Sequence, residues 1–247
     1  MTETSTDTQS WCEERLRQPH EDLHLARLFS PPELRSTVSA SAAIYIELEA
    51  TIAGYRDLNV ARTKLAWWRD ELTRLEDGRP AHPATKLLAS GAAPPAVNQL
   101  LDLVTGMELN LLVGPAEDLA TAELVAERGF AQFAAVLGAQ LETRGKNANL
   151  EDYLALGKNI GLSRRLQGAL DAEARADIAA AAGAGLRTAS SRLPTDPPAL
   201  RVLAALAWRR ASRPSAPLPQ KRESRRRVFI AWRAARGKLP RGLRSGY

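Results

Sequence analysis

The chain has 247 residues, of which 45% are apolar, and Ala, Leu, Arg and Glu outnumber Ile, Val and the aromatic residues. This length and composition suit a single globular domain, favour helix over sheet and argue against global disorder. The single cysteine, Cys12, excludes an intrachain disulfide and fits a reducing, cytoplasmic setting. No apolar run is long enough to predict a membrane-spanning helix.

The net charge of +6 is concentrated at the C-terminal end. Residues 221–247 contain ten Lys or Arg and one Glu, which gives this segment +9 and leaves −3 on the rest of the chain. Such a segment could bind an anionic membrane surface, a nucleic acid or an acidic protein, or it could be a solvated helix end. Nothing else in the chain resembles a nucleic-acid module, so a membrane surface or a protein is the expected partner.

In chain order, the polar stretch from Met1 to Ser10 predicts a flexible N-terminus over residues 1–19. A short helix is expected over 21–29, and a longer one is expected to follow and to end at Gly54. The next helix starts near Asp57 and ends before Gly78, and steps of three and four residues predict one buried face. The apolar residues of that face are Leu58, Ala61, Leu65, Trp68, Leu72 and Leu75.

Six further helices are expected before a linker at 212–220 that contains three prolines, and they cover 83–89, 96–111, 116–142, 150–170, 172–190 and 199–211. Small residues in the third of these would let neighbouring helices approach closely. A last basic helix is expected over 222–236, where Val228, Phe229 and Trp232 form an apolar patch that should dock it. The prediction is an all-α, single-domain bundle over 20–211, with a Pro-rich linker and a basic C-terminal helix and tail over 221–247.

Two motifs give this bundle a family resemblance. The first has the spacing Leu-x-Trp-Trp-Arg-x-x-Leu and consists of Leu65, Trp67, Trp68, Arg69 and Leu72. The second has the spacing Gly-x-Pro-x-His-Pro and consists of Gly78, Pro80, His82 and Pro83. On these motifs, and on a weaker match at residues 154–157, the chain resembles the squalene/phytoene synthase family, which implies the isoprenoid synthase fold.

The resemblance also implies where metal ligands should lie. Active members carry an Asp-x-x-x-Asp pair on each of two facing helices, a spacing that puts both carboxylates on one helical face. Magnesium then bridges the carboxylates to the substrate diphosphate. The first pair falls at Glu49 and Ala53, and no acidic residue lies four positions after Glu47 or Glu49.

The second pair falls at Gly168 and Ala172, so it is also degenerate. Asp171 is out of register, and Arg164 stands where the family usually has asparagine. No cofactor and no metal site are therefore expected, and Mg²⁺ would be needed only if the chain is active with atypical ligands.

Candidates to line a cavity or to bind phosphate are Lys64, Trp67, Arg69, Arg164 and Arg165. Arg164 could bind a diphosphate without metal, because a guanidinium binds phosphate bidentately. The preferred interpretation is that it pairs with Glu47 or Glu49 across the former active site.

The other candidates are expected to be structural or solvent-exposed. Trp68 is expected in the core and Lys64 in solvent. Arg69 is expected to be structural, in a buried network with Asp70 and Glu71. His82 is expected to be a hydrogen-bonding loop residue rather than a catalytic base.

Three hypotheses of function remain. The preferred one is a non-catalytic pseudoenzyme that binds an isoprenoid or helps to assemble a membrane complex, like a degenerate branch of the family that includes assembly factors for respiratory complex I. The alternative is a head-to-head prenyltransferase that condenses two prenyl diphosphates with atypical metal ligands. A third is a peripheral membrane or nucleic-acid adaptor that acts through the basic tail. A cytoplasmic location is expected, and the tail leaves membrane association open.

Overall fold

The computed structural model describes residues 5–17, 20–54, 57–91, 95–113, 118–141, 149–166, 172–192, 197–214 and 221–243. Within these residues every regular element is helical. The α-helices are α1 (Ser5–Arg15), α2 (Glu21–Leu28), α3 (Arg35–Gly54), α4 (Leu58–Glu76), α5 (Pro83–Ala89), α6 (Val97–Val113), α7 (Leu119–Ala126), α8 (Gln132–Leu141), α9 (Leu150–Arg165), α10 (Ala172–Arg192), α11 (Pro198–Ala211) and α12 (Lys221–Ala235).

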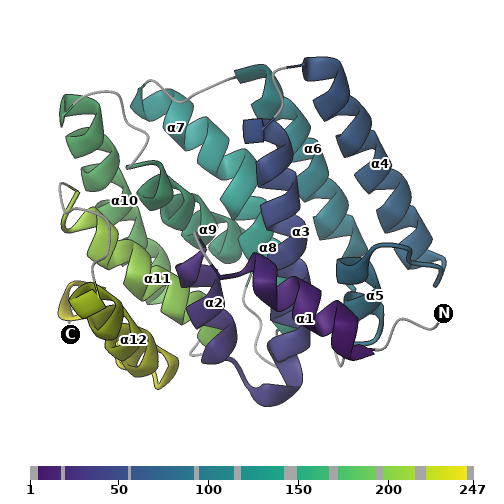
Figure 1. Ribbon diagram of the computed structural model, residues 1–247. Helices are drawn as coiled ribbons and strands as arrows, with labels where there is room; N and C mark the ends of the chain where they lie inside the picture. Colours follow the sequence, from purple (N-terminus) through teal and green to yellow (C-terminus); the bar gives the residue numbers. More distant parts are fainter. Residues whose placement is uncertain are drawn as a thin grey trace.

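The helices form two packed groups that meet at α8 and α9 (Figure 1). Helices α3, α4 and α6 stand on one side, and α10, α11 and α12 pack together on the other. The short helices α1 and α2 cross the lower end of the bundle, where α1 contacts α3 and α5, and α2 contacts α3 and α11. The N-terminal helices therefore lie next to both groups. Among the described helices, none combines the length and the hydrophobicity that crossing a bilayer requires.

Helix α4 shows how the sequence pattern produces a core face. Its first turn is capped by Asp57, whose side chain accepts a hydrogen bond from the Asn59 backbone N–H at 2.8 Å. The chain leaves the helix at Gly78, whose φ of +73° favours glycine. Leu58, which was expected on the buried face, is 46% exposed. The rest of that face is buried and consists of Ala61, Leu65, Trp68, Leu72 and Leu75.

The helix expected over 116–142 is interrupted by a π-helical turn, Glu127–Ala131, between α7 and α8. Close packing against α9 depends on two glycines. A Cβ atom at Gly138 would lie 2.4 Å from the Tyr153 ring, and one at Gly157 would lie 2.5 Å from the Ala134 Cβ. The prediction that small residues here allow a close approach is confirmed at these contacts.

The N-terminal segment differs from its prediction. Residues 5–15, expected within a flexible N-terminus, form α1, and Cys12 and Leu16 are fully buried in the main core. Burial raises the pKa of the Cys12 thiol to about 12, so this cysteine is a core residue and not a reactive thiol. The segment has few apolar residues, so its sequence showed no helical pattern. Two buried apolar side chains, Cys12 and Leu16, and contacts from its polar side chains hold it against the core.

The C-terminal helix docks, but not through the residues that the sequence indicated. Ala231 and Ala234 are fully buried, and Arg201 of α11 donates hydrogen bonds to the carbonyl oxygens of Ala234 and Ala235 at 3.1 and 2.8 Å. Val228, Phe229 and Trp232 instead remain 41%, 54% and 38% exposed. The prediction that these large side chains dock the helix is therefore wrong. The small alanines let the backbone of α12 approach α11 closely, and the large side chains remain partly exposed.

Candidate functional site

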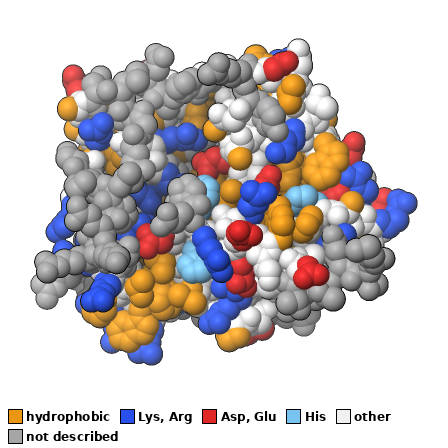
Figure 2. Space-filling model, viewed as in Figure 1, with side chains coloured by type: hydrophobic (Ala, Val, Ile, Leu, Met, Phe, Trp, Pro, Cys, Tyr) orange, Lys and Arg blue, Asp and Glu red, His pale blue; other side chains and the backbone are white. Residues whose placement is uncertain are grey.

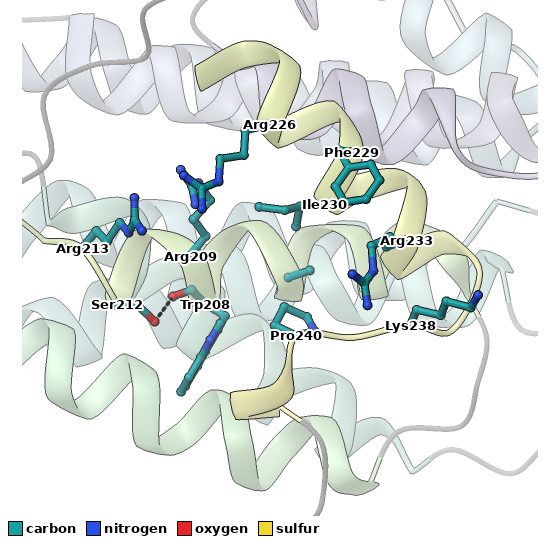
Figure 3. Close-up of a pocket in the computed structure, with 11 residues that line it drawn as sticks. Trp208, Arg209, Ser212, Arg213, Arg226, Phe229, Ile230, Arg233, Lys238 and Pro240 are labelled. Atoms are coloured by element: carbon teal, nitrogen blue, oxygen red, sulfur yellow. Dashed lines mark hydrogen bonds between the residues drawn. The ribbon is translucent and has the colours of Figure 1, made fainter. Parts of the chain in front are cut away.

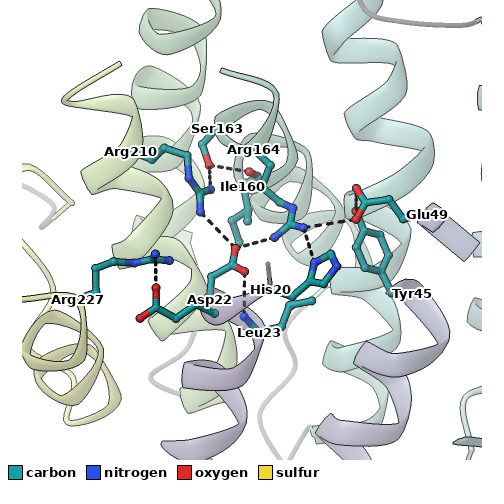
Figure 4. A network of polar contacts seen from close by, with 11 residues as sticks. His20, Asp22, Leu23, Tyr45, Glu49, Ile160, Ser163, Arg164, Arg210 and Arg227 are labelled. Carbon is teal, nitrogen blue, oxygen red and sulfur yellow. Dashed lines mark hydrogen bonds and ion pairs between the residues drawn. The ribbon is translucent and has the colours of Figure 1, made fainter. Parts of the chain in front are cut away.

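Helices α3 and α9 bring the partly buried side chains of Glu49 and Arg164 to face each other (Figure 4). Arg164 Nη2 lies 3.4 Å from Glu49 Oε2, so the pairing with Glu49 expected from the sequence is present. The shorter contact of Arg164 is to Asp22 of α2, with 2.7 Å between Nη1 and Oδ2. Nη2 also lies 3.3 Å from Nδ1 of His20. The guanidinium thus joins α2, α3 and α9.

Asp22 is the central acceptor of this network. It is buried in the first turn of α2, where a carboxylate is favoured by the helix dipole, and Oδ1 accepts from the Leu23 backbone N–H at 3.0 Å. Its Oδ2 also accepts from Arg210 of α11 at 3.3 Å. Arg210 donates in addition to the Ser163 hydroxyl at 3.0 Å. One carboxylate therefore ties together two arginines from different helices.

Burial alone would oppose the ionisation of Asp22, but the charges of Arg164 and Arg210 outweigh it and hold the pKa of this carboxyl well below its usual range. Burial acts against the charge of Arg164 as well, yet Asp22, Tyr45 and Glu49 raise its pKa overall. Arginine stays protonated in proteins, so both guanidinium groups carry their charge. Two cations thus face two carboxylates, Asp22 and Glu49, and the cluster is close to charge-balanced.

Aromatic rings complete the surroundings of Arg164. Its guanidinium carbon lies 5.3 Å from the ring centroid of Phe130, on the π-helical turn, and 6.0 Å from that of Tyr45. The Tyr45 hydroxyl donates to Glu49 Oε1 at 3.0 Å, which fixes the carboxylate toward the network. Burial and the charge of Arg164 lower the pKa of His20, so a neutral imidazole faces the arginine.

This donor set does not fit a magnesium ion. Magnesium requires near-octahedral oxygen ligands, whereas the oxygens of Asp22 and Glu49 accept hydrogen bonds from guanidinium groups. Across the described ranges, no group of three or more His, Cys, Asp or Glu side chains is arranged to hold a metal ion. The cation between α3 and α9 is an arginine of the chain itself.

Of the remaining motif positions, those that the structure describes supply no carboxylate. Ala53 is exposed near the end of α3. Gly168 and Asp171 lie outside the described residues. Helix α9, expected to reach residue 170, ends at Arg165, and two arginines in its last turn suit the helix dipole there. Ala172 is exposed as the first residue of α10, so it does not share a face of α9.

Glu47 belongs to a separate group on α3. It pairs with Arg15 of α1 at 3.2 Å and with Lys64 of α4 at 3.6 Å, and it makes no ion pair with Arg164. Lys64 is 33% exposed and not simply solvated, since this contact links α3 to α4. Arg165 is half-buried beside Arg164 in the last turn of α9.

The other two candidates lie elsewhere on α4. Arg69 makes a bidentate pair with Glu108 of α6, with nitrogen–oxygen distances of 2.8 and 2.6 Å. Trp67 is 40% exposed, with the ring centroid of His82 5.9 Å away. Arg69 and Trp67 thus have partners of their own, and the five sequence candidates are not brought together.

The expected network of Arg69, Asp70 and Glu71 is also wrong, because consecutive helical residues point in different directions. Asp70 is exposed, and the fully buried carboxylate of Glu71 pairs instead with Arg74 and Thr85.

The second family motif is a structural clamp around that carboxylate. Glu71 accepts hydrogen bonds from the backbone N–H groups of Ala81 and His82, each at 2.8 Å. His82 in turn caps α5, because its Nδ1 accepts from the Ala84 N–H at 3.2 Å. Burial lowers the pKa of His82, which keeps the imidazole neutral for this bond. The loop role expected for His82 is confirmed by this cap.

Sequence reasoning missed Asp22, His20, Ser163 and Arg210. Asp22 and Arg210 are separated by 188 residues, and no motif spacing relates them. The sequence signal nearest to this site was the acidic pair Glu21 and Asp22 at the start of α2. Such a pair indicates where a helix begins, but it does not indicate that one carboxylate is a buried hydrogen-bond acceptor.

The squalene/phytoene synthase family model matches residues 16–241, which includes α12. Among solved structures, the chain is similar to a dehydrosqualene synthase crystallised in complex with ligand. The TM-score is 0.73 at 13% identity, over 94% of this chain and 98% of that one, so the likeness concerns the fold. A comparison with curated proteins finds no significant match. The fold predicted from the sequence is confirmed.

Proposed function

The chain belongs to the squalene/phytoene synthase family, and we propose that it is a non-catalytic member that binds an isoprenoid or helps to assemble a membrane complex. The observation that carries the proposal is the position of Arg164. Its guanidinium lies between the two helices that would hold the metal ligands, and it is neutralised there by Asp22 and Glu49.

The charge balance of this site supports the proposal. A prenyl diphosphate carries several negative charges, and its departure needs metal ions or free cations that draw off the developing charge. Arg164 and Arg210 already share Asp22, and Glu49 lies against Arg164 as well. Binding a diphosphate here would require these buried pairs to break, which is costly because each charge would lose its partner.

The ligand class of the proposal comes from the family. Members of the family act on prenyl diphosphates. In this chain the carboxylate of Asp22 already pairs with the arginines that could bind a diphosphate, so the proposed ligand is an isoprenoid lipid without a diphosphate group. Assembly of a membrane complex is the second form of the same proposal, in which the fold serves as a protein-binding surface.

Product analysis tests the proposal directly. Purified protein is incubated with farnesyl and geranylgeranyl diphosphates, with and without magnesium, beside an active synthase. We expect no condensed product and no metal-dependent release of diphosphate. A condensed product would establish the alternative, a head-to-head prenyltransferase with atypical ligands. The Glu49→Gln variant would then show whether Glu49 is one of those ligands.

Ligand binding gives a second measurement. Native mass spectrometry compares complexes with farnesol and with farnesyl diphosphate. We expect no gain in affinity from the diphosphate that depends on Arg164, because the guanidinium charges of the α3–α9 site are already paired. Tighter binding of the diphosphate that is lost in Arg164→Gln would count against a closed anion site.

A further inference from the structure

A pocket of about 650 Å³ lies between α11, α12 and the segment that follows α12 (Figure 3). Apolar and cationic side chains both line it. The apolar residues are Ala205, Trp208, Phe229, Ile230 and Pro240, and the cationic residues are Arg209, Arg213, Arg226, Arg233 and Lys238.

The cationic side chains form two groups. In Figure 3, Arg209, Arg213 and Arg226 gather toward one end of the pocket, and Arg233 and Lys238 lie toward the other. The described residues contribute no Asp or Glu to the lining. The pocket therefore carries an excess of positive charge, which favours an anionic ligand.

Large apolar side chains continue this surface outward. Helix α12 docks through its alanines, so Val228, Phe229 and Trp232 are left partly exposed, and Leu28 at the end of α2 is 39% exposed. Figure 2 shows hydrophobic side chains beside Lys and Arg over this part of the molecule. A smaller pocket of about 290 Å³, lined by Leu28 and Trp232 among others, adjoins α12.

Arginines are also stacked on the exposed aromatic rings. The guanidinium carbon of Arg236 lies 4.4 Å from the Trp232 ring, and that of Arg233 lies 5.9 Å from the Phe229 ring. Exposed Trp and Phe side chains beside a basic helix face are typical of a helix that lies in a membrane interface.

We propose that this α12 surface binds an anionic phospholipid of a bilayer, with the lipid phosphate at the arginines and an acyl chain against Trp208, Phe229 and Ile230. An inorganic phosphate would leave the apolar wall in water, and a neutral lipid would supply no counter-charge to Arg213 and Arg226. An anionic amphiphile satisfies both. The inference concerns a second site and holds whether or not the α3–α9 site is catalytic.

Vesicle co-sedimentation of the full chain tests this site. Vesicles of phosphatidylcholine alone are compared with vesicles that also contain phosphatidylglycerol. We expect binding only to the anionic vesicles, falling as salt is added. The double variant R213A/R226A should bind about 30-fold more weakly, since each basic residue near an anionic surface adds about 1 kcal/mol. Phe229→Ala should weaken binding about tenfold through lost apolar contact.

The matched control is the double variant R62A/R79A, which removes the same charge from exposed positions on and after α4. It should bind like the unmodified chain. Equal losses in both double variants would overturn the proposal, because net charge alone would then explain binding. Tighter binding to a duplex oligonucleotide, without an effect of Phe229→Ala, would overturn it in favour of a nucleic acid. Competition by millimolar inorganic phosphate that is as strong as competition by lipid would also overturn it.

Discussion

The site between α3 and α9 and the pocket at α12 are both rich in arginine, but their arginines have different partners. In the first, Arg164 and Arg210 point into the interior, toward Asp22 and Glu49. In the second, the lining cations face apolar walls, and the described residues supply no carboxylate to that lining. The same residue type therefore supports the fold in one region and can bind a ligand in the other.

The difference lies in desolvation. An arginine removed from water needs a counter-charge within the protein, and a site that supplies one has no charge left for a ligand. An arginine at a pocket rim keeps its water and can exchange it for a phosphate. Substitutions in the α3–α9 site should therefore lower the free energy of unfolding. Substitutions of the arginines in the α12 pocket should instead weaken lipid binding.

The largest effect is expected from Asp22→Ala. This change leaves Arg164 and Arg210, whose side chains are largely but not fully buried, without their main counter-charge, and it should lower the free energy of unfolding by about 3 kcal/mol. Urea denaturation followed by circular dichroism measures it. The double variant D22L/R164M should recover part of the loss, because apolar side chains of similar size need no partner. An unchanged urea midpoint in Asp22→Ala would mean that the network is not structural.

A second, smaller loss is expected from Glu71→Ala, which removes a buried carboxylate that accepts from two backbone N–H groups as well as from Arg74. The variant leaves the N–H groups of Ala81 and His82 without an acceptor and should cost about 2–3 kcal/mol. Asp70→Ala, one residue away and exposed, is the control and should stay within about 0.5 kcal/mol. Equal urea midpoints for the two variants would refute the clamp.

Acid should weaken the α3–α9 site and not the α12 pocket. Burial opposes ionisation of Asp22, but its arginine partners hold the pKa below the unfolded value of about 4. Its contribution is therefore complete above about pH 4 and is lost as the pH falls further, toward the folded pKa. Asp22→Asn should flatten the dependence of unfolding free energy on pH below about pH 4. R213A/R226A should retain the unmodified curve, and a flattened curve in that variant would contradict the assignment.

The smallest change in stability is expected from R213A/R226A itself. The free energy of unfolding should stay within about 0.5 kcal/mol of the unmodified value, because neither side chain supports a buried partner. Thermal unfolding monitored by circular dichroism is sufficient. A large loss would place these arginines in the same structural class as Arg164 and remove the contrast between the two regions.

Local signals explain what could be predicted from the sequence. Asp57 caps α4, Pro83 begins α5, Asn149 caps α9 and Gly78 ends α4, each through a preference that acts within a few residues. The periodic apolar stripe then identified the core face of α4. The family motifs predicted the fold. They could be recognised because residues 64–83, which contain the clamp, form one short stretch of chain.

Long-range choices explain what could not be predicted. A carboxylate such as Asp22 opens α2 in the same way whether it faces solvent or two arginines. From the sequence, any of the apolar residues of α12 could pack against the protein core or face a bilayer. In the structure, Ala231 and Ala234 are the ones buried in the core. The pairing of Arg164 with Glu49 could be anticipated because the resemblance placed both residues at the former metal site.

The buried position of Asp22 also has a consequence for synthesis of the chain. Its partner Arg210 follows 188 residues later, so at about 5–20 residues per second the ribosome delivers it roughly 10–40 seconds after Asp22. During that interval α2 has no complete charge partner and cannot take its final place. Helix α2 should therefore be among the last elements to dock, after α9 and α11 have left the exit tunnel.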